Sequence, residues 1–145
     1  YRDHYHAQGQ LLNRLFPGVR GMLEAVRGAG LAVGIASNKG QNGLEHALQA
    51  LDLAGLCDLA VGARSGGPRK PDPAFYEEFI APVYPHISRQ RVVLLGDTAT
   101  DLAFARNLGL DACFAAWGYG DHEACLALGP RYVAERPEAV FAAWK

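Results

Sequence analysis

Short apolar runs alternate along this chain with segments of helical periodicity, and this alternation constrains the fold more than any other feature. The apolar runs are "LAVGIAS" at 31–37, "LAVGA" at 59–63, "RVVLLG" at 91–96, "DACFAAW" at 111–117 and the short "RYVA" at 131–134. Helices are predicted between and around them, near 19–26, 44–51, 74–83, 101–108, 122–128 and 138–144. Parallel strands need such crossovers, and the crossovers cover both faces of the sheet. The pattern therefore predicts an α/β fold: a doubly wound, mainly parallel, Rossmann-like sheet with helices on both faces.

Composition narrows the class of protein. The chain has 145 residues, half of them hydrophobic, and a formal net charge of −1. This charge gives no electrostatic reason to expect nucleic acid or an anionic membrane as a partner. No apolar run reaches the roughly 20 residues of a membrane span. Cys57, Cys113 and Cys125 form no metal-binding spacing, so we expect buried free thiols and a cytoplasmic protein.

Ligands of doubly wound sheets bind at the carboxyl ends of the strands, so the residues that follow each predicted strand are the candidate site. Ser37 and Asn38 follow the first strand. A hydroxyl, an amide and the free N–H groups at the start of a helix can all donate to a phosphate. A serine here can also simply cap the next helix.

Lys70 lies in the loop "RSGGPRKPDP", which follows the second strand. The usual interpretation of a loop lysine is a solvated charge. The flanking prolines argue against it, because they stiffen the loop and aim the side chain. A compact ammonium group suits a phosphoryl oxygen or a carboxylate.

Asp97 and Asp101 follow the third strand in "GDTATD". Thr98 and Asp101 match the spacing of a capping box, which explains Asp101 without any ligand. The same spacing leaves Asp97 unexplained. A carboxylate directly after a buried strand needs a positive partner, and both Mg²⁺ and Lys70 are candidates.

These signals fall on three successive strand ends, and together they favour phosphoryl chemistry. Phosphoryl transfer depends on positioning the phosphate and neutralising its charge. A hydroxyl, an ammonium group and a pair of carboxylates supply both.

The motifs "GIASNKG", "GGPRKPDPAFY" and "VVLLGDTATDLAFARNLGL" resemble, in order and spacing, the second, third and fourth motifs of the haloacid dehalogenase superfamily. The stretch "FPGVRGMLEAVRGAGLAVGIASNK" resembles the core of its phosphoglycolate-phosphatase-like members. The resemblance implies a phosphoric monoester hydrolase that uses Mg²⁺ and acts on a small phosphorylated metabolite. It implies that Ser37, Asn38 and Lys70 bind the phosphoryl group, with Lys70 also stabilising the nucleophile. Asp97, supported by Asp101, would hold the metal.

The first motif of that family, D-x-D-G-T/S after an apolar strand, does not occur in these 145 residues. In the family its first aspartate is the nucleophile that forms an aspartyl-phosphate, and the motif follows the central strand. We therefore expect residues 16–145 to be a core domain without this strand, and residues 1–15 to be the end of a helical cap. We also expect this chain alone to be catalytically inactive and to fold poorly, because a missing central strand leaves backbone groups unpaired.

Three alternatives remain open. A receiver-like phosphoacceptor domain shares the fold, but there the acids come early and the lysine late. A nucleotide-binding module is disfavoured because neither G-x-x-x-x-G-K-[ST] nor a helix-opening G-x-G-x-x-G occurs. A non-catalytic binding or scaffold member of the same superfamily is the third. The sequence gives no indication of oligomeric state.

Overall fold

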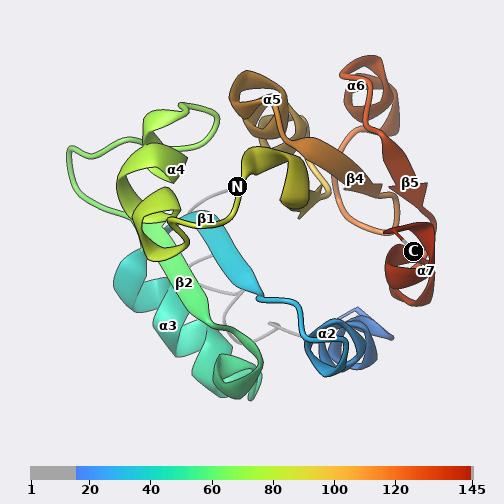
Figure 1. Cartoon of the computed structure of the whole chain (residues 1–145), viewed down its shortest axis with the longest axis horizontal. Helices are drawn as coiled ribbons and strands as arrows, with labels where there is room; N and C mark the ends of the chain where they lie inside the picture. The colour runs from blue at the N-terminus through green and yellow to red at the C-terminus, as the bar shows by residue number, and fades with distance from the viewer. Residues whose placement is uncertain (1–15, 145) are drawn as a thin grey trace.

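The computed structural model describes residues 16–144 as alternating strands and helices (Figure 1). The α-helices are α2 (Val19–Gly28), α3 (Gln41–Ala50), α4 (Ala74–Phe79), α5 (Ala99–Leu108), α6 (His122–Ala127) and α7 (Val140–Trp144). The strands are β1 (Gly34–Gly40), β2 (Leu59–Ala63), β3 (Val93–Gly96), β4 (Asp111–Ala115) and β5 (Tyr132–Ala134). Short 3-10 turns occupy Ala54–Leu56, Ala81–Val83, Arg89–Arg91 and Pro137–Ala139.

All strand pairs among the described residues are parallel, and they form two separate groups. β1 pairs with β2, while β3, β4 and β5 pair in that order. β1 and β3 thus each have one edge without a strand partner in the described part of the chain. The predicted α/β fold is confirmed, but its hydrogen-bonded sheet is divided into two halves.

Helices cover both faces, as the doubly wound fold requires. In β4, Ala112 and Phe114 pack into one core cluster with α4 and α5, whereas Cys113 between them packs with α2 and α7. This alternation is the period-two pattern of a strand with both sides buried. Leu44 and Leu48 of α3 pack over the β1–β2 pair in a third cluster.

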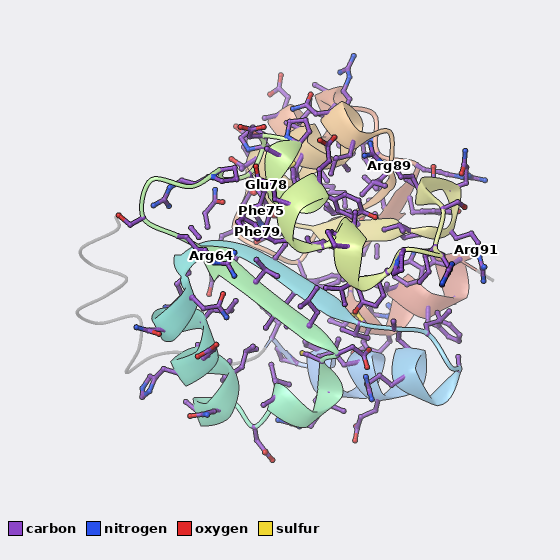
Figure 2. The ribbon with its side chains drawn as sticks, turned by 60° about the vertical axis from the view of Figure 1, so that its left-hand side comes forward. Arg64, Phe75, Glu78, Phe79, Arg89 and Arg91 are labelled. Carbon is purple, nitrogen blue, oxygen red and sulfur yellow. The ribbon has the colours of Figure 1, made fainter. Side chains whose placement is uncertain are left out.

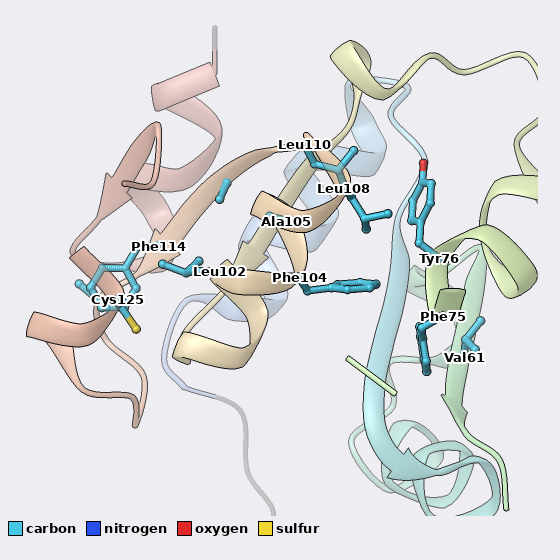
Figure 3. Close-up of a cluster of buried hydrophobic side chains, with 12 residues drawn as sticks. Val61, Phe75, Tyr76, Leu102, Phe104, Ala105, Leu108, Leu110, Phe114 and Cys125 are labelled. Atoms are coloured by element: carbon cyan, nitrogen blue, oxygen red, sulfur yellow. The ribbon is translucent and has the colours of Figure 1, made fainter. Parts of the chain in front are cut away.

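The two half-sheets are joined by side-chain packing between helices α4 and α5. Phe75 of α4 and Phe104 of α5 are both fully buried, and their ring centroids lie 5.9 Å apart, edge to face. Figure 3 shows this cluster reaching from Val61 on β2 to Phe114 on β4. An edge-to-face aromatic contact adds to the burial of apolar area, so this cluster is a main link between the halves.

A cavity of about 800 Å³ lies between β1 and β3. Its walls include Ile35 and Ala36 of β1 and Leu94 and Leu95 of β3. The residues of β1 are only half-buried or exposed, whereas β2 and β4 contain fully buried ones. The middle of this sheet is therefore less buried than its flanks, the reverse of a complete doubly wound sheet.

Most predicted elements are confirmed, with shifted boundaries. β1 begins at Gly34 instead of Leu31, because Val33 is engaged by Asp58 through both its N–H and its carbonyl. The predicted helix 74–83 ends as an α-helix at Phe79 and continues as a 3-10 turn that contains Pro82, which has no N–H to donate. The cysteines are free, but only Cys113 and Cys125 are fully buried. Residues 1–15, predicted to end a helical cap, lie outside the described residues.

No helix among the described residues has the length and apolar character that crossing a lipid bilayer requires.

The packing between the half-sheets predicts a large stability loss for Phe75→Ala. Because Phe75 is 0% exposed and contacts both Phe79 and Phe104, we expect a loss of about 3–5 kcal/mol in the free energy of unfolding. Urea unfolding measures it. The control Leu126→Ala, at an exposed position of α6, should change stability by less than about 0.5 kcal/mol. Equal losses in the two variants would contradict the role given to this cluster.

Candidate active site

The residues singled out at the strand ends come together at one end of the cavity. Ser37 near the end of β1, Lys70 in the loop after β2, and Asp97 and Asp101 after β3 all line it. Their convergence follows from the parallel strands, whose carboxyl ends lie at the same edge.

Lys70 is the centre of this group. Its Nζ donates to the carbonyl of Ala36 at 2.9 Å and to Oδ1 of Asp101 at 2.6 Å. The side chains of the ion pair are only 12% and 14% exposed. A charge-assisted hydrogen bond at this depth is screened little by water, so it fixes the position of the ammonium group. Mg²⁺ and Lys70 are the two candidate positive partners of Asp97, and Lys70 pairs with Asp101 instead.

The loop that carries Lys70 is held at its backbone by Asn38. The side-chain Nδ2 of Asn38 donates to the carbonyl of Lys70 at 3.0 Å, and the N–H of Lys70 donates to Oδ1 of Asn38 at 2.9 Å. At the start of the same loop, the guanidinium of Arg64 stacks over the ring of Phe79, 4.0 Å from its centroid (Figure 2). The loop is thus anchored on β1 and on α4, which makes it a defined part of the site.

Asp101 combines its ion pair with a helix cap. Its N–H donates to Oγ1 of Thr98, the N-cap residue of α5, at 3.3 Å. Its Oδ2 accepts from the Thr98 hydroxyl at 3.0 Å and from the N–H of Asp97 at 3.3 Å. The capping role of Thr98 is confirmed, and both carboxylate oxygens of Asp101 have partners within the protein.

Asp97 is enclosed by the loop after β4, which the sequence interpretation did not connect with it. The N–H of Tyr119 donates to Oδ2 of Asp97 at 3.0 Å. A Cβ added to Gly118 would lie 2.2 Å from this same oxygen, and one added to Gly120 would lie 1.9 Å from the Asp97 carbonyl. Only glycines allow so close an approach, and the pattern "WGYGD" is the signal that could have indicated it.

Ser37 does not cap α3. That helix begins at Gln41 after Gly40, and no side chain caps it. Ser37 Oγ instead accepts from the N–H of Lys39 at 3.0 Å. The capping explanation is therefore wrong for Ser37, and its hydroxyl proton remains able to donate toward the cavity.

Cys125 lies beside the acids but is unsuited to act as a nucleophile. Its Sγ donates to the carbonyl of Asp97 at 3.7 Å, and the side chain is fully buried. Burial raises the pKa of the Cys125 thiol, and the nearby negative charge of Asp97 raises it further. A thiol of this kind stays protonated at neutral pH and is unreactive.

The two acids can supply part of the oxygen ligands that a hard cation requires. No cluster of three or more His, Cys, Asp or Glu side chains suited to a metal occurs in residues 16–144. Asp97 and Asp101 with Lys70 nevertheless leave one net negative charge at this end of the cavity. Mg²⁺ commonly takes only one or two carboxylates and keeps waters and substrate oxygens as its other ligands. Of the two acids, Asp97 is the one that Lys70 does not engage, so it is the one that could contact such a cation.

Comparison with known proteins shows which family has a sequence similar to that of this chain. The sequence profile described as haloacid dehalogenase-like hydrolase matches residues 1–115. The phosphoglycolate phosphatase of Aquifex aeolicus is 27% identical over 124 residues, which are 82% of this chain and 55% of that protein. The tyrosine-protein kinase PtkA of Mycobacterium tuberculosis is 28% identical over 120 residues, which are 83% of this chain and 40% of the kinase.

Among solved structures, a haloacid dehalogenase-like family hydrolase from Streptococcus pneumoniae has the same fold. It superposes with a TM-score of 0.85 at 23% identity, covering 100% of this chain and 67% of its own. The chain spans about half the length of the curated relatives it matches. Because the family profile covers residues 1–115 of 145, the chain belongs to the haloacid dehalogenase-like hydrolases and is similar to their phosphoglycolate phosphatases.

Proposed function

We propose that this chain forms the core of a Mg²⁺-dependent phosphatase that hydrolyses small phosphate monoesters through an aspartyl-phosphate. The observation that carries the proposal is the placement of Lys70 Nζ between the Ala36 carbonyl and Asp101, at the cavity that Ser37 and Asp97 also line. An ammonium group has three N–H donors, and two of them are used here. The third is free to bind a phosphoryl oxygen or the nucleophilic carboxylate.

Each residue then has a distinct role. Ser37 and Lys70 bind the phosphoryl oxygens. Asn38 acts mainly through Lys70, because its amide is committed to the lysine's backbone N–H and carbonyl. Asp97 holds Mg²⁺, and Asp101 supports the site by fixing Lys70 and the N–H of Asp97. The bound metal would neutralise charge on the phosphoryl group.

The nucleophile belongs to a D-x-D segment that the 145 residues do not contain. We propose that the complete protein supplies it, together with a helical cap, and that residues 1–15 belong to the end of this cap. The cap would select the substrate, for which a small phosphoglycolate-like monoester is the working expectation from the phosphatase relatives.

Two alternatives make different predictions. A scaffold protein would retain this fold but bind neither Mg²⁺ nor phosphate at the site. A phosphoryl transferase would pass the group to an acceptor other than water, and one similar protein is named a tyrosine-protein kinase. Release of inorganic phosphate by the complete protein separates hydrolysis from both.

In the complete protein, Asp97→Asn should lower activity and weaken Mg²⁺ activation together. The neutral amide keeps the acceptor for Tyr119 but removes the charge that attracts the cation, so we expect at least a roughly tenfold rise in the Mg²⁺ concentration for half activation. Phosphate release against Mg²⁺ concentration measures it. Asp52→Asn, an exposed site after α3, makes the same charge change and should alter nothing. Unchanged Mg²⁺ activation in Asp97→Asn would remove the metal assignment.

Asn38→Ala should lower kcat/KM of the complete protein by roughly 10- to 100-fold, because Lys70 loses both backbone anchors and shifts from its productive position. Lys70→Met should lose more, since it removes the charge itself. Asn42→Ala, an exposed position on α3, is the matched control. Steady-state kinetics measure this. A kcat/KM of Asn38→Ala equal to that of the Asn42→Ala control would contradict the role of the amide.

The 145-residue chain alone should show no Mg²⁺-dependent turnover of p-nitrophenyl phosphate, because the D-x-D motif that would supply the nucleophile does not occur in it. The same 145-residue chain after heat inactivation serves as the blank. Mg²⁺-dependent turnover by the purified chain above this blank would contradict the prediction.

A further inference from the structure

Arg69 directly precedes Lys70 in the loop after β2, and its side chain is bound to the same end of β1. The Nη1 of Arg69 donates to the carbonyl of Asn38 at 3.1 Å. The Nζ of Lys70 donates to the carbonyl of Ala36, two residues earlier in the same strand. Consecutive residues of this loop thus place two cationic groups on backbone carbonyls of one short stretch of β1.

The two carbonyls are separated by about the length of a small metabolite. Two residues of chain span at most roughly 7 Å, so the carbonyls of Ala36 and Asn38 lie only about that far apart. In the proposed function Lys70 binds the phosphoryl oxygens. A ligand held there would bring a group a few bonds from its phosphorus close to the guanidinium of Arg69.

The Arg69 guanidinium keeps most of its hydrogen-bonding capacity. Of the five N–H donors of its planar fork, Nη1 supplies the one that binds Asn38. The edge formed by Nε and Nη2 is left open, and such an edge binds a carboxylate or a phosphate through two parallel hydrogen bonds. Because the Arg69 side chain is exposed, this edge is accessible to a ligand.

No acid in the described part of the chain neutralises Arg69. None of the ion pairs found between residues 16 and 144 includes it. The two acids near it in the loop and the site have other partners, since Asp101 binds Lys70 and Asp72 Oδ1 accepts from the N–H of Ala74. The charge of Arg69 is therefore available to an anion from solution.

The other arginine of the loop is directed elsewhere. The guanidinium of Arg64 lies over the ring of Phe79, 4.0 Å from its centroid, so it is fixed on α4. An exposed loop arginine is usually only solvated. Arg69 differs because its hydrogen bond to Asn38 holds it at the strand end that carries the candidate site.

We propose that Arg69 is a specificity-determining residue, which binds a second anionic group of the substrate, a carboxylate or a second phosphate a few bonds from the phosphoryl group. The inference rests on the proposed function, because it takes Lys70 as the phosphoryl-binding residue. It means that the core selects for doubly anionic monoesters in addition to any selection by the cap. A monoester with a neutral second group leaves the guanidinium solvated and gains no binding energy from it.

The experiment compares phosphoglycolate with its carboxamide, which has nearly the same size but lacks the second charge. Ethylene glycol bisphosphate is a further substrate, in which a phosphate replaces the carboxylate. Initial rates of phosphate release give kcat/KM for the complete protein and for its Arg69→Gln and Arg69→Lys variants. Arg106→Gln, an exposed position in the last turn of α5, makes the same charge change as a control. Thermal unfolding checks that each variant is folded.

We expect the natural protein to prefer at least one of the two doubly anionic substrates over the carboxamide by at least roughly tenfold in kcat/KM. Arg69→Gln should remove this preference and leave the carboxamide within about twofold of its original value. Arg69→Lys should keep part of the preference, because it keeps the charge but not the planar fork. Arg106→Gln should keep all of it.

The pattern over the substrates distinguishes ligand binding from a purely structural role. If Arg69 only anchored the loop, its loss would displace Lys70 and lower kcat/KM for every substrate by the same factor. A larger loss for phosphoglycolate than for the bisphosphate, or the reverse, identifies the second anion. A preference that Arg69→Gln leaves unchanged, or a natural protein that prefers neither anion over the carboxamide, would overturn the assignment.

A binding measurement separates this inference from the phosphatase proposal. Calorimetry with the methylene phosphonate analogue of phosphoglycolate, and with the carboxamide of this analogue, measures the same preference without turnover. Binding that depends on Arg69, with no phosphate release from any substrate, would support the anion site and count against the phosphatase. Phosphate release with no dependence on Arg69 in rates or in binding would do the opposite.

Discussion

The ion pair between Lys70 and Asp101 is the interaction on which the candidate site depends. It joins a loop of the β1–β2 half to the helix after β3, so it spans the division between the half-sheets. Removing either partner would leave the other charge largely buried and uncompensated, which is strongly unfavourable. Asn38, Ala36 and Thr98 each form a hydrogen bond to one member of this pair.

The rest of the fold holds the two half-sheets together, although no continuous hydrogen-bonded sheet joins them. The link on one face is the aromatic packing of Phe75 and Phe104, and on the other it is the packing of α2 against α7. Side-chain packing depends on the relative placement of whole helices.

The periodicity of apolar residues predicted the helices and strands. The parallel arrangement predicted that Ser37, Lys70, Asp97 and Asp101 would lie close together, because the carboxyl ends of parallel strands lie at the same edge of the sheet. The supporting contacts were not predictable in the same way. Asn38 binds the backbone N–H of Lys70, 32 residues away, and Asp97 binds the backbone N–H of Tyr119, 22 residues away. Backbone N–H groups are not visible in the pattern of side chains along a sequence, so these contacts could not be predicted from it. The 3-10 turn at Ala81–Val83 contains Pro82, which has no N–H to donate, whereas the late start of β1 depends on Asp58, which lies 25 residues from Val33 along the chain.

The central claim is that the site is assembled across two half-sheets with a cavity between them. Amide hydrogen exchange of the 145-residue chain, resolved by residue, tests it most directly. Successive residues of a strand turn their backbone groups to opposite edges, and the Ala36 carbonyl accepts from Lys70 at the cavity. The N–H groups of Gly34 and Ala36 should therefore exchange at least roughly a hundredfold faster than those of Ile35 and of Cys113 in β4. Protection of Gly34 and Ala36 equal to that of Ile35 would show that the edge is already paired and would contradict the account.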